Sequence, residues 1–179
     1  PTTTLFRSTV NLLRALSKRN DLQLILFSDR KLVAEHLEDI CAEVVIITAP
    51  RETLWEAWAL PQALRRARVD VFHAPADRGL PLVKPCPCVV TIHGSFERSH
   101  WRTLFPSVRK RYWYWKNELA NRIQADAVIT VSDTTRRELA ALGVASELRL
   151  RRIYPAPAPE FTSEPHRMDV DVLLRHEIF

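Results

Sequence analysis

The segment ADAVITVSDTTRRELAALG, residues 125–143, combines a strand with the helix that follows it. Residues 127–131 are small, apolar or β-branched at every position, which is typical of a strand buried in a parallel sheet. Ser132 is a favourable N-cap, and the helix that it begins should run to Leu142 and end at Gly143, because glycine tolerates a left-handed backbone. A strand that leads directly into a helix is the repeating unit of α/β folds.

The same alternation of short strands and longer helices extends along the rest of the chain. We expect further strands at residues 22–27, 44–47, 69–72, 88–92 and 149–154. We expect further helices at residues 5–20, 31–40, 52–68 and 107–124. The pattern predicts an α/β fold that is Rossmann-like and doubly wound, with a mainly parallel sheet and helices on both faces.

The composition of the 179 residues is that of a soluble globular domain, with 46% hydrophobic and 26% charged residues. No run of about 18 apolar residues occurs, so we expect no transmembrane helix. Cys86 and Cys88 form a pair without the second pair that a structural zinc site needs. Together with Cys41, they are expected to be reduced thiols, as in a cytosolic protein.

Five segments, taken in chain order, resemble one family of enzymes. They are residues 11–16 (NLLRAL), 70–75 (DVFHAP), 89–94 (VVTIHG), 125–132 (ADAVITVS) and 152–155 (RIYP) with the Glu-Phe pair at 160–161. Each is similar to a segment of the N-terminal domain of retaining glycosyltransferases of the GT-B fold, the group 1 or family 4-like glycosyl transferases. No one segment is decisive, but their order over residues 5–161 makes the resemblance specific.

In this family two Rossmann-like domains enclose the active site. The resemblance implies that residues 1–161 are the acceptor-side domain, that residues 162–179 begin the interdomain linker, and that the C-terminal donor domain is absent from this chain. The family's first strand is also expected to be missing, which would deprive the strands at 22–27 and 69–72 of their shared neighbour. A fragment of this kind is expected to be inactive alone.

The resemblance also implies a reaction. A sugar moves from a nucleotide-sugar donor to a glycan or lipid-linked acceptor with retention, as in cell-envelope polysaccharide or glycolipid synthesis by a hexosyltransferase-type enzyme. The family implies no cofactor and no metal. Asp169 and Asp171 have the spacing of a metal-binding pair, but they lie in the expected linker, and we interpret the spacing as chance.

His93 follows the strand at residues 88–92, at the edge of the sheet where open α/β folds bind ligands. By resemblance it is the catalytic-site residue that contacts the donor sugar near the reacting centre. The alternative is a loop histidine bonded to the backbone. Gly94 permits close approach of a ligand to the backbone, and we expect Gly94 and Ser95 to contact donor or acceptor.

His73 and Asp77 are the other candidate donor- or acceptor-binding residues. By resemblance His73 lines the acceptor side of the cleft, and the alternative is a buried, hydrogen-bonded histidine. Asp77 lies in the proline-rich loop that follows, where it either binds sugar hydroxyls or faces solvent.

The segment RKRYWYWK at residues 109–116 mixes cations with large aromatic side chains. From Arg98 to Arg122 seven Lys and Arg residues face one acid, although the whole chain has a net charge of only +5. Such a mixture suits an anionic membrane surface, and a solvated cationic face is the alternative. We expect no nucleic acid partner, because no recognition fold accompanies the cations. The expected anionic-surface patch is Arg109, Lys110, Arg111, Trp113 and Lys116.

The helix at residues 107–124 also carries an apolar stripe with helical spacing. We expect this stripe to face the core of the domain. Its members are Val108, Tyr112, Trp115, Leu119 and Ile123.

Three functions remain open on the sequence alone. The first is the acceptor half of a cytoplasmic glycosyltransferase that can associate with a membrane. The second is a non-catalytic, degenerate GT-B half that binds a membrane or a protein, which the glycine-free residues 2–6 favour, since the family has a Gly-rich loop there. The third is a nucleotide-sugar epimerase-like GT-B enzyme, although residues 70–75 and 89–94 fit transferases better.

Overall fold

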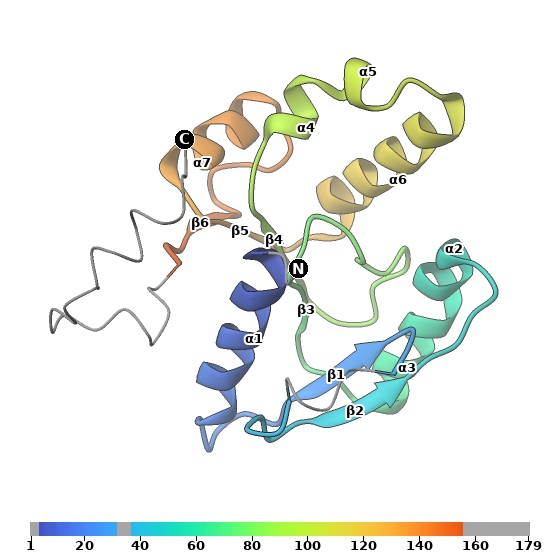
Figure 1. The fold of residues 1–179 in the computed structure, drawn as a ribbon, viewed down its shortest axis with the longest axis vertical. Coiled ribbons are helices and arrows are strands. Elements are labelled where there is room, and N and C mark those ends of the chain that lie inside the picture. The colour runs from blue at the N-terminus through green and yellow to red at the C-terminus, as the bar shows by residue number, and fades with distance from the viewer. Residues whose placement is uncertain (1–3, 32–36, 156–179) are drawn as a thin grey trace, which may run out of the picture.

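In the computed structural model, which describes residues 4–31 and 37–155, each strand runs parallel to its paired neighbours. The strands are β1 (Ile25–Ser28), β2 (Glu43–Ile46), β3 (Phe72–Ala74), β4 (Cys88–Ile92), β5 (Ala127–Thr130) and β6 (Leu150–Arg152). Parallel strands flanked by helices confirm the α/β fold class expected from the sequence (Figure 1).

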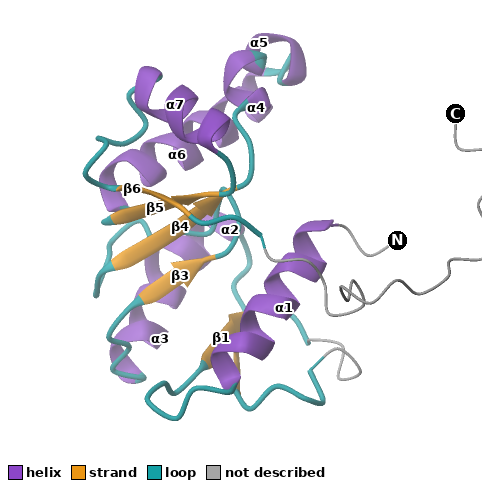
Figure 2. Cartoon of the chain, turned by 90° about the vertical axis from the view of Figure 1, so that its left-hand side faces the viewer, coloured by secondary structure: helices purple, strands orange, loops and turns teal. Residues whose placement is uncertain are grey.

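The helices lie on both sides of the strands, with α1 on one side and α3 on the other (Figure 2). They are α1 (Thr4–Ser17), α2 (Glu52–Leu54), η2 (Trp55–Ala59), α3 (Leu60–Arg66), α4 (Phe96–Ser99), α5 (Trp101–Leu104), α6 (Val108–Gln124) and α7 (Asp133–Ala141). α2, η2 and α3 follow one another without a break, and η2 is a π-helical turn. Residues 32–36, half of the helix expected at residues 31–40, lie outside the described residues, and residues 37–39 form a turn rather than a helix.

Serine side chains cap two of the helices, and Ser132 and Gly143 act as the sequence predicts. Ser107 Oγ accepts a hydrogen bond from the Lys110 N–H at 3.3 Å and caps α6. Ser132 Oγ accepts one from the Thr135 N–H at 3.1 Å and caps α7. Gly143, just beyond α7, has φ +62°, in the left-handed region that glycine adopts at little cost.

The strands form two separate sheets. β1 pairs only with β2, and the remaining strands form a sheet in the order β3-β4-β5-β6. Within the described residues no ladder of hydrogen bonds joins β1 to β3, although these two strands are neighbours in Figures 1 and 2. β1 and β3 therefore belong to different sheets in the described residues.

The hydrophobic core is built on the four-stranded sheet. Val90, Ile92 and Val128 are fully buried in it, and Leu139 brings α7 onto the same cluster. All buried members of this cluster lie between Ala74 and Leu150. The candidate site residues that follow β4 are therefore attached to the buried core of the larger sheet.

The prediction that the apolar stripe of α6 faces the core is wrong. Its five side chains, from Val108 to Ile123, are between 48% and 82% exposed. The buried residues of α6 are instead Glu118, Ala120 and Asn121. Helical spacing identifies the apolar side correctly, but the buried side is polar because Glu118 pairs with Arg98 of α4 and Asn121 donates to a backbone carbonyl in the loop of Asp77.

Candidate functional site

His93 stands directly after β4, with its side chain half-buried. Its backbone N–H donates a hydrogen bond to Asp77 Oδ1 at 3.2 Å, and its ring Nε2 lies 3.0 Å from the carbonyl oxygen of Pro75. A carbonyl oxygen can only accept, so Nε2 carries the proton in this arrangement. In the neutral ring Nδ1 then holds a lone pair that can accept a hydrogen bond from a substrate hydroxyl.

His73 lies in β3, and its Nε2 is 2.8 Å from the hydroxyl oxygen of Thr91 in β4. Burial lowers the pKa of His73, because desolvation disfavours the charged imidazolium. The structure thus places His73 as a half-buried histidine bonded to the neighbouring strand. His73 pairs with Val89 near the start of β4, whereas His93 follows the end of β4, so the structure does not bring the two histidines to the same edge of the sheet.

Asp77 does not face solvent freely. Its Oδ1 accepts from the backbone of His93, and its Oδ2 lies 3.2 Å from Arg98 Nη1. Its backbone carbonyl accepts a hydrogen bond of 2.8 Å from Asn121 Nδ2 of α6. The side chain of Asp77 is 34% exposed, and the contacts of its carboxylate tie the loop after β3 to the loop after β4.

Gly94 and Ser95 have different surroundings. An added Cβ at Gly94 would meet no atom within 4 Å in the described part of the chain, and its φ lies outside the left-handed region. The space beside Gly94 is therefore open to a ligand. Ser95 is buried, and its hydroxyl donates to a carboxylate oxygen of Glu138 in α7. The structure thus places Gly94 at open space and Ser95 against α7.

The expected anionic-surface patch divides into two parts. Arg109, Lys110 and Arg111 are exposed at the start of α6. Lys116 is not on this surface, because its buried ammonium pairs with the buried carboxylate of Glu56 in η2. The same ammonium lies 4.7 Å from the ring centroid of Trp113. Neither the charge of Lys116 nor the face of Trp113 that it covers is available to an external anion.

The sequence did not predict the buried residues that support the loop of His93. Arg98 and Glu118 are buried and in contact, and Asn121 reaches the loop of Asp77. From the sequence alone, Arg98 is only one of the cations in the basic stretch. The available signal was the row of Glu118, Asn121 and Arg122, polar side chains spaced three and four residues apart on one side of α6.

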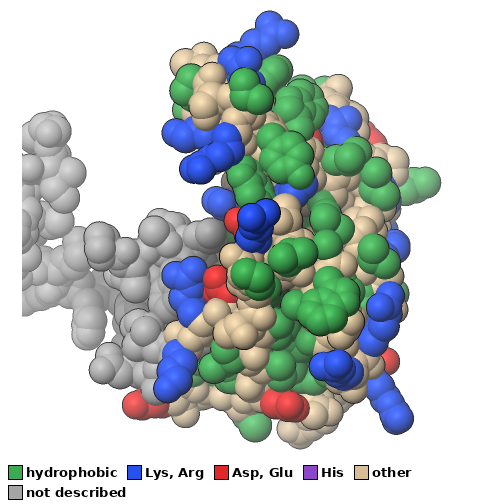
Figure 3. All heavy atoms as spheres, turned by 90° about the vertical axis from the view of Figure 1, so that its right-hand side faces the viewer, with side chains coloured by type: hydrophobic (Ala, Val, Ile, Leu, Met, Phe, Trp, Pro, Cys, Tyr) green, Lys and Arg blue, Asp and Glu red, His purple; other side chains and the backbone are tan. Residues whose placement is uncertain are grey.

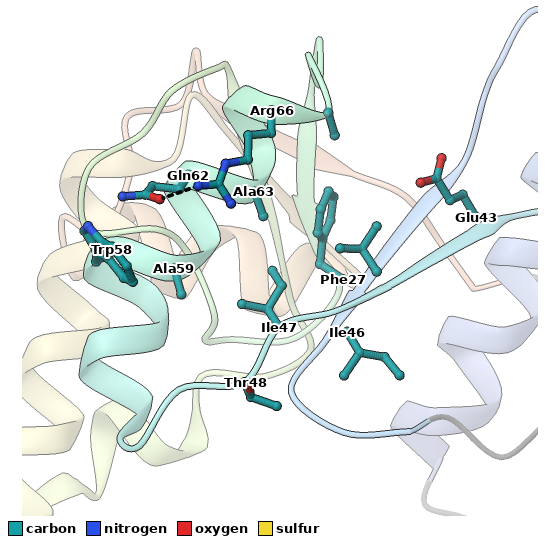
Figure 4. A pocket seen from close by; sticks show the side chains of 12 residues that line it. Phe27, Glu43, Ile46, Ile47, Thr48, Trp58, Ala59, Gln62, Ala63 and Arg66 are labelled. Atoms are coloured by element: carbon teal, nitrogen blue, oxygen red, sulfur yellow. Dashed lines mark hydrogen bonds between the residues drawn. The ribbon is translucent and has the colours of Figure 1, made fainter.

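A separate groove of about 540 Å³ lies between the small sheet and the helical stretch of η2 and α3 (Figure 4). Phe27 and Ile47 supply apolar walls on the strand side, facing Ala59 and Ala63. Neither His93 nor His73 lines this groove. It is therefore distinct from the sheet edge that carries the predicted site residues.

Gly94→Ala should leave the stability of the domain unchanged and lower its affinity for a ligand that approaches the backbone of residue 94. The added methyl meets no protein atom but fills the open space. Gly79→Ala is the matched control, because Gly79 also has open surroundings but a φ of +94°. Thermal unfolding should show a loss of about 1 kcal/mol for Gly79→Ala only. Equal loss in both variants would contradict this description of Gly94.

In the described residues no helix is long and apolar enough to cross a membrane, and no group of three or more His, Cys, Asp or Glu side chains could hold a metal ion. A protein-family model described as Glycosyltransferase Family 4 matches residues 5–157. Neither a curated protein nor a solved structure matches the chain. The family match covers both histidines and most of the chain.

Proposed function

The chain belongs to glycosyltransferase family 4, as an N-terminal domain of the GT-B fold, and we propose that it is the acceptor-side half of a retaining enzyme. The enzyme transfers a hexose from a nucleotide sugar to a glycan or lipid-linked acceptor at the cytoplasmic side of a membrane. A donor-binding domain completes the site. The reaction serves cell-envelope polysaccharide or glycolipid synthesis.

The observation that carries this proposal is the setting of His93. Its ring follows the carboxyl end of a buried strand, beside the open space at Gly94. The hydrogen bond to Pro75 assigns the proton to Nε2 in the neutral ring, so Nδ1 can accept from a sugar hydroxyl. Directed hydrogen bonds of this kind orient a sugar at the reacting centre.

The test is a transfer assay on the protein that carries both this domain and the donor-binding domain. Labelled nucleotide sugars are offered with extracted lipid-linked acceptors, and the anomeric configuration of the product is read by NMR. A product with the configuration of the donor supports the proposal. A product of inverted configuration contradicts retention, and epimerised nucleotide sugar without transfer supports the epimerase-like alternative.

A second function, binding to a membrane, rests on the surface of α6. Its exposed apolar stripe from Val108 to Ile123 runs beside the exposed cations Arg109, Lys110 and Arg111. Hydrophobic side chains gather with Lys and Arg on the face of the molecule in Figure 3. Apolar groups that enter the headgroup region and cations that meet anionic lipids are the two contributions that hold interfacial helices.

Replacing Arg109, Lys110 and Arg111 with Glu should abolish binding to vesicles that contain anionic lipid. Each cation near such a surface contributes about 1 kcal/mol, so reversal of three charges should lower the partition coefficient by at least about a hundredfold. Co-sedimentation with vesicles of phosphatidylcholine and phosphatidylserine measures this. The matched control is Arg65, Arg66 and Arg68→Glu, on and just after α3. Binding that survives the α6 substitutions would show that this patch is not responsible.

A further inference from the structure

A buried arginine lies beneath the loop that presents His93. The side chain of Arg98, in α4, is 5% exposed. Its Nη1 lies 3.2 Å from Asp77 Oδ2 and donates to the carbonyl oxygen of Gly94 at 3.2 Å. Its Nε lies 2.9 Å from Glu118 Oε2, a charge contact without the alignment of a hydrogen bond. One guanidinium therefore touches the loop after β3, the loop after β4 and helix α6.

These contacts fix the backbone on both sides of the His93 ring. Asp77 accepts from the N–H of His93, and Arg98 donates to the C=O of Gly94. The ring itself bonds to Pro75, which belongs to the same loop as Asp77. Since Arg98 also holds Asp77, a single side chain supports the contacts at the backbone before and after His93.

Because the side chain of residue 98 is buried, only an arginine can support the His93 loop in this way. A buried charge is tolerated only when it is paired, and here two carboxylates compensate one guanidinium. The planar guanidinium has several donors in fixed directions, so it can bridge three groups at once. Glu118 is 3% exposed and is anchored in α6, which makes it a rigid counter-charge.

We infer that Arg98 is a positioning residue for His93, with Asp77 and Glu118 as its anchors. The inference deepens the proposed function and rests on it, because it assigns to Arg98 the task of holding the histidine at the reacting centre. Arg98 does not itself touch substrate. It acts through the backbone of residues 93 and 94.

The test compares Arg98→Lys with Arg122→Lys in this chain. Lysine keeps the charge but cannot reach Gly94, Asp77 and Glu118 together. Arg122 is the matched control, because it also contacts Glu118, at 3.5 Å, but its Nη atoms bond to the carbonyls of Leu142 and Gly143 rather than to the His93 loop. Amide hydrogen exchange of His93, measured by NMR, is the readout, since its N–H is the donor to Asp77.

Arg98→Lys should accelerate exchange at the His93 amide at least about tenfold, because the loop loses stabilisation comparable to that of one hydrogen bond. Arg122→Lys should leave that amide unchanged. Should Arg98→Lys fail to fold, the paired variant Arg98→Met with Glu118→Gln removes the charge and its buried counter-charge together and takes its place. Unchanged exchange at His93, or equal acceleration by Arg122→Lys, would overturn the inference.

Kinetics on the two-domain protein separate this inference from the proposed function. Arg98→Lys should lower kcat by about tenfold to a hundredfold with little change in the donor KM, because a small displacement of a reacting group mainly affects the chemical step. A raised KM with normal kcat would count against positioning. If exchange at His93 responds but His93→Ala transfers sugar normally, the proposed role of His93 fails while the structural link from Arg98 to the loop stands.

Discussion

His93→Ala is expected to lower the rate of sugar transfer by about a hundredfold to a thousandfold, the loss seen when one directed hydrogen-bonding group is removed from a reacting centre. The fold should persist, because the ring is only half-buried and makes one hydrogen bond, to Pro75, while the backbone N–H keeps its bond to Asp77. The rate is measured by the transfer assay, and the fold by circular dichroism and thermal unfolding.

His100→Ala is the control for this substitution. His100 lies a few residues further along, is exposed, and stacks on Phe96 with ring centroids 4.4 Å apart. Loss of its ring should leave the transfer rate within about twofold, as expected for a surface change away from the site. A normal rate in His93→Ala would remove His93 from the reacting centre, and an equal loss in both variants would assign the effect to the loop as a whole.

Lys116→Met should lower the free energy of unfolding by about 3–5 kcal/mol, because it leaves the buried carboxylate of Glu56 without its counter-charge. Glu56 lies in the π-helical turn, and its backbone carbonyl also accepts from the Leu82 N–H. The pair therefore joins η2 to α6. Urea unfolding of this chain at neutral pH measures the loss.

The matched control is Lys84→Met. Lys84 pairs with Asp126, but both side chains are substantially exposed, so the expected loss is below about 1 kcal/mol. Glu56→Leu with Lys116→Met should recover most of the stability, since apolar side chains can replace a buried ion pair at little loss. Equal losses for Lys116→Met and Lys84→Met would show that the Glu56 pair is not isolated from water.

The stability of Lys116→Met should also depend on pH. Burial raises the pKa of Glu56 even with Lys116 beside it, and removal of the ammonium leaves burial unopposed by this partner. The folded state then binds the proton more tightly than the unfolded state does. The free energy of unfolding should therefore rise as the pH falls from neutral toward the ordinary glutamate pKa of about 4.3.

Much of the fold could be predicted because its signals are local. Ser132 and Gly143 bound α7 as the sequence indicates, and β4 has the predicted ends. The position of His93 follows from β4, since open α/β folds bind ligands at the carboxyl ends of their strands, whereas His73 lies within β3 and pairs with Val89. Local pattern therefore sufficed to bring these two candidates to neighbouring strands.

The rest depends on contacts between residues far apart in the chain, which local spacing does not record. Lys116 belongs by sequence to a cationic run, but Glu56, sixty residues earlier, draws it into the interior. Arg98 and Glu118 are likewise held in the interior by contacts with each other, with Asp77 and with Arg122. The same contacts explain the orientation of α6, because they bury its polar row and leave its apolar stripe outside.

The separation of the strands into two sheets has a consequence for how the domain comes apart. The buried apolar cluster on the larger sheet lies between residues 74 and 150, whereas the strands of the small sheet are only partly buried or exposed. Opening β1 and β2 breaks no ladder in the larger sheet. Heating or limited proteolysis should therefore unfold or cleave the first third of the chain first, as a separate unit. The sheet edge with His93 belongs to the rest of the domain, which should open more slowly.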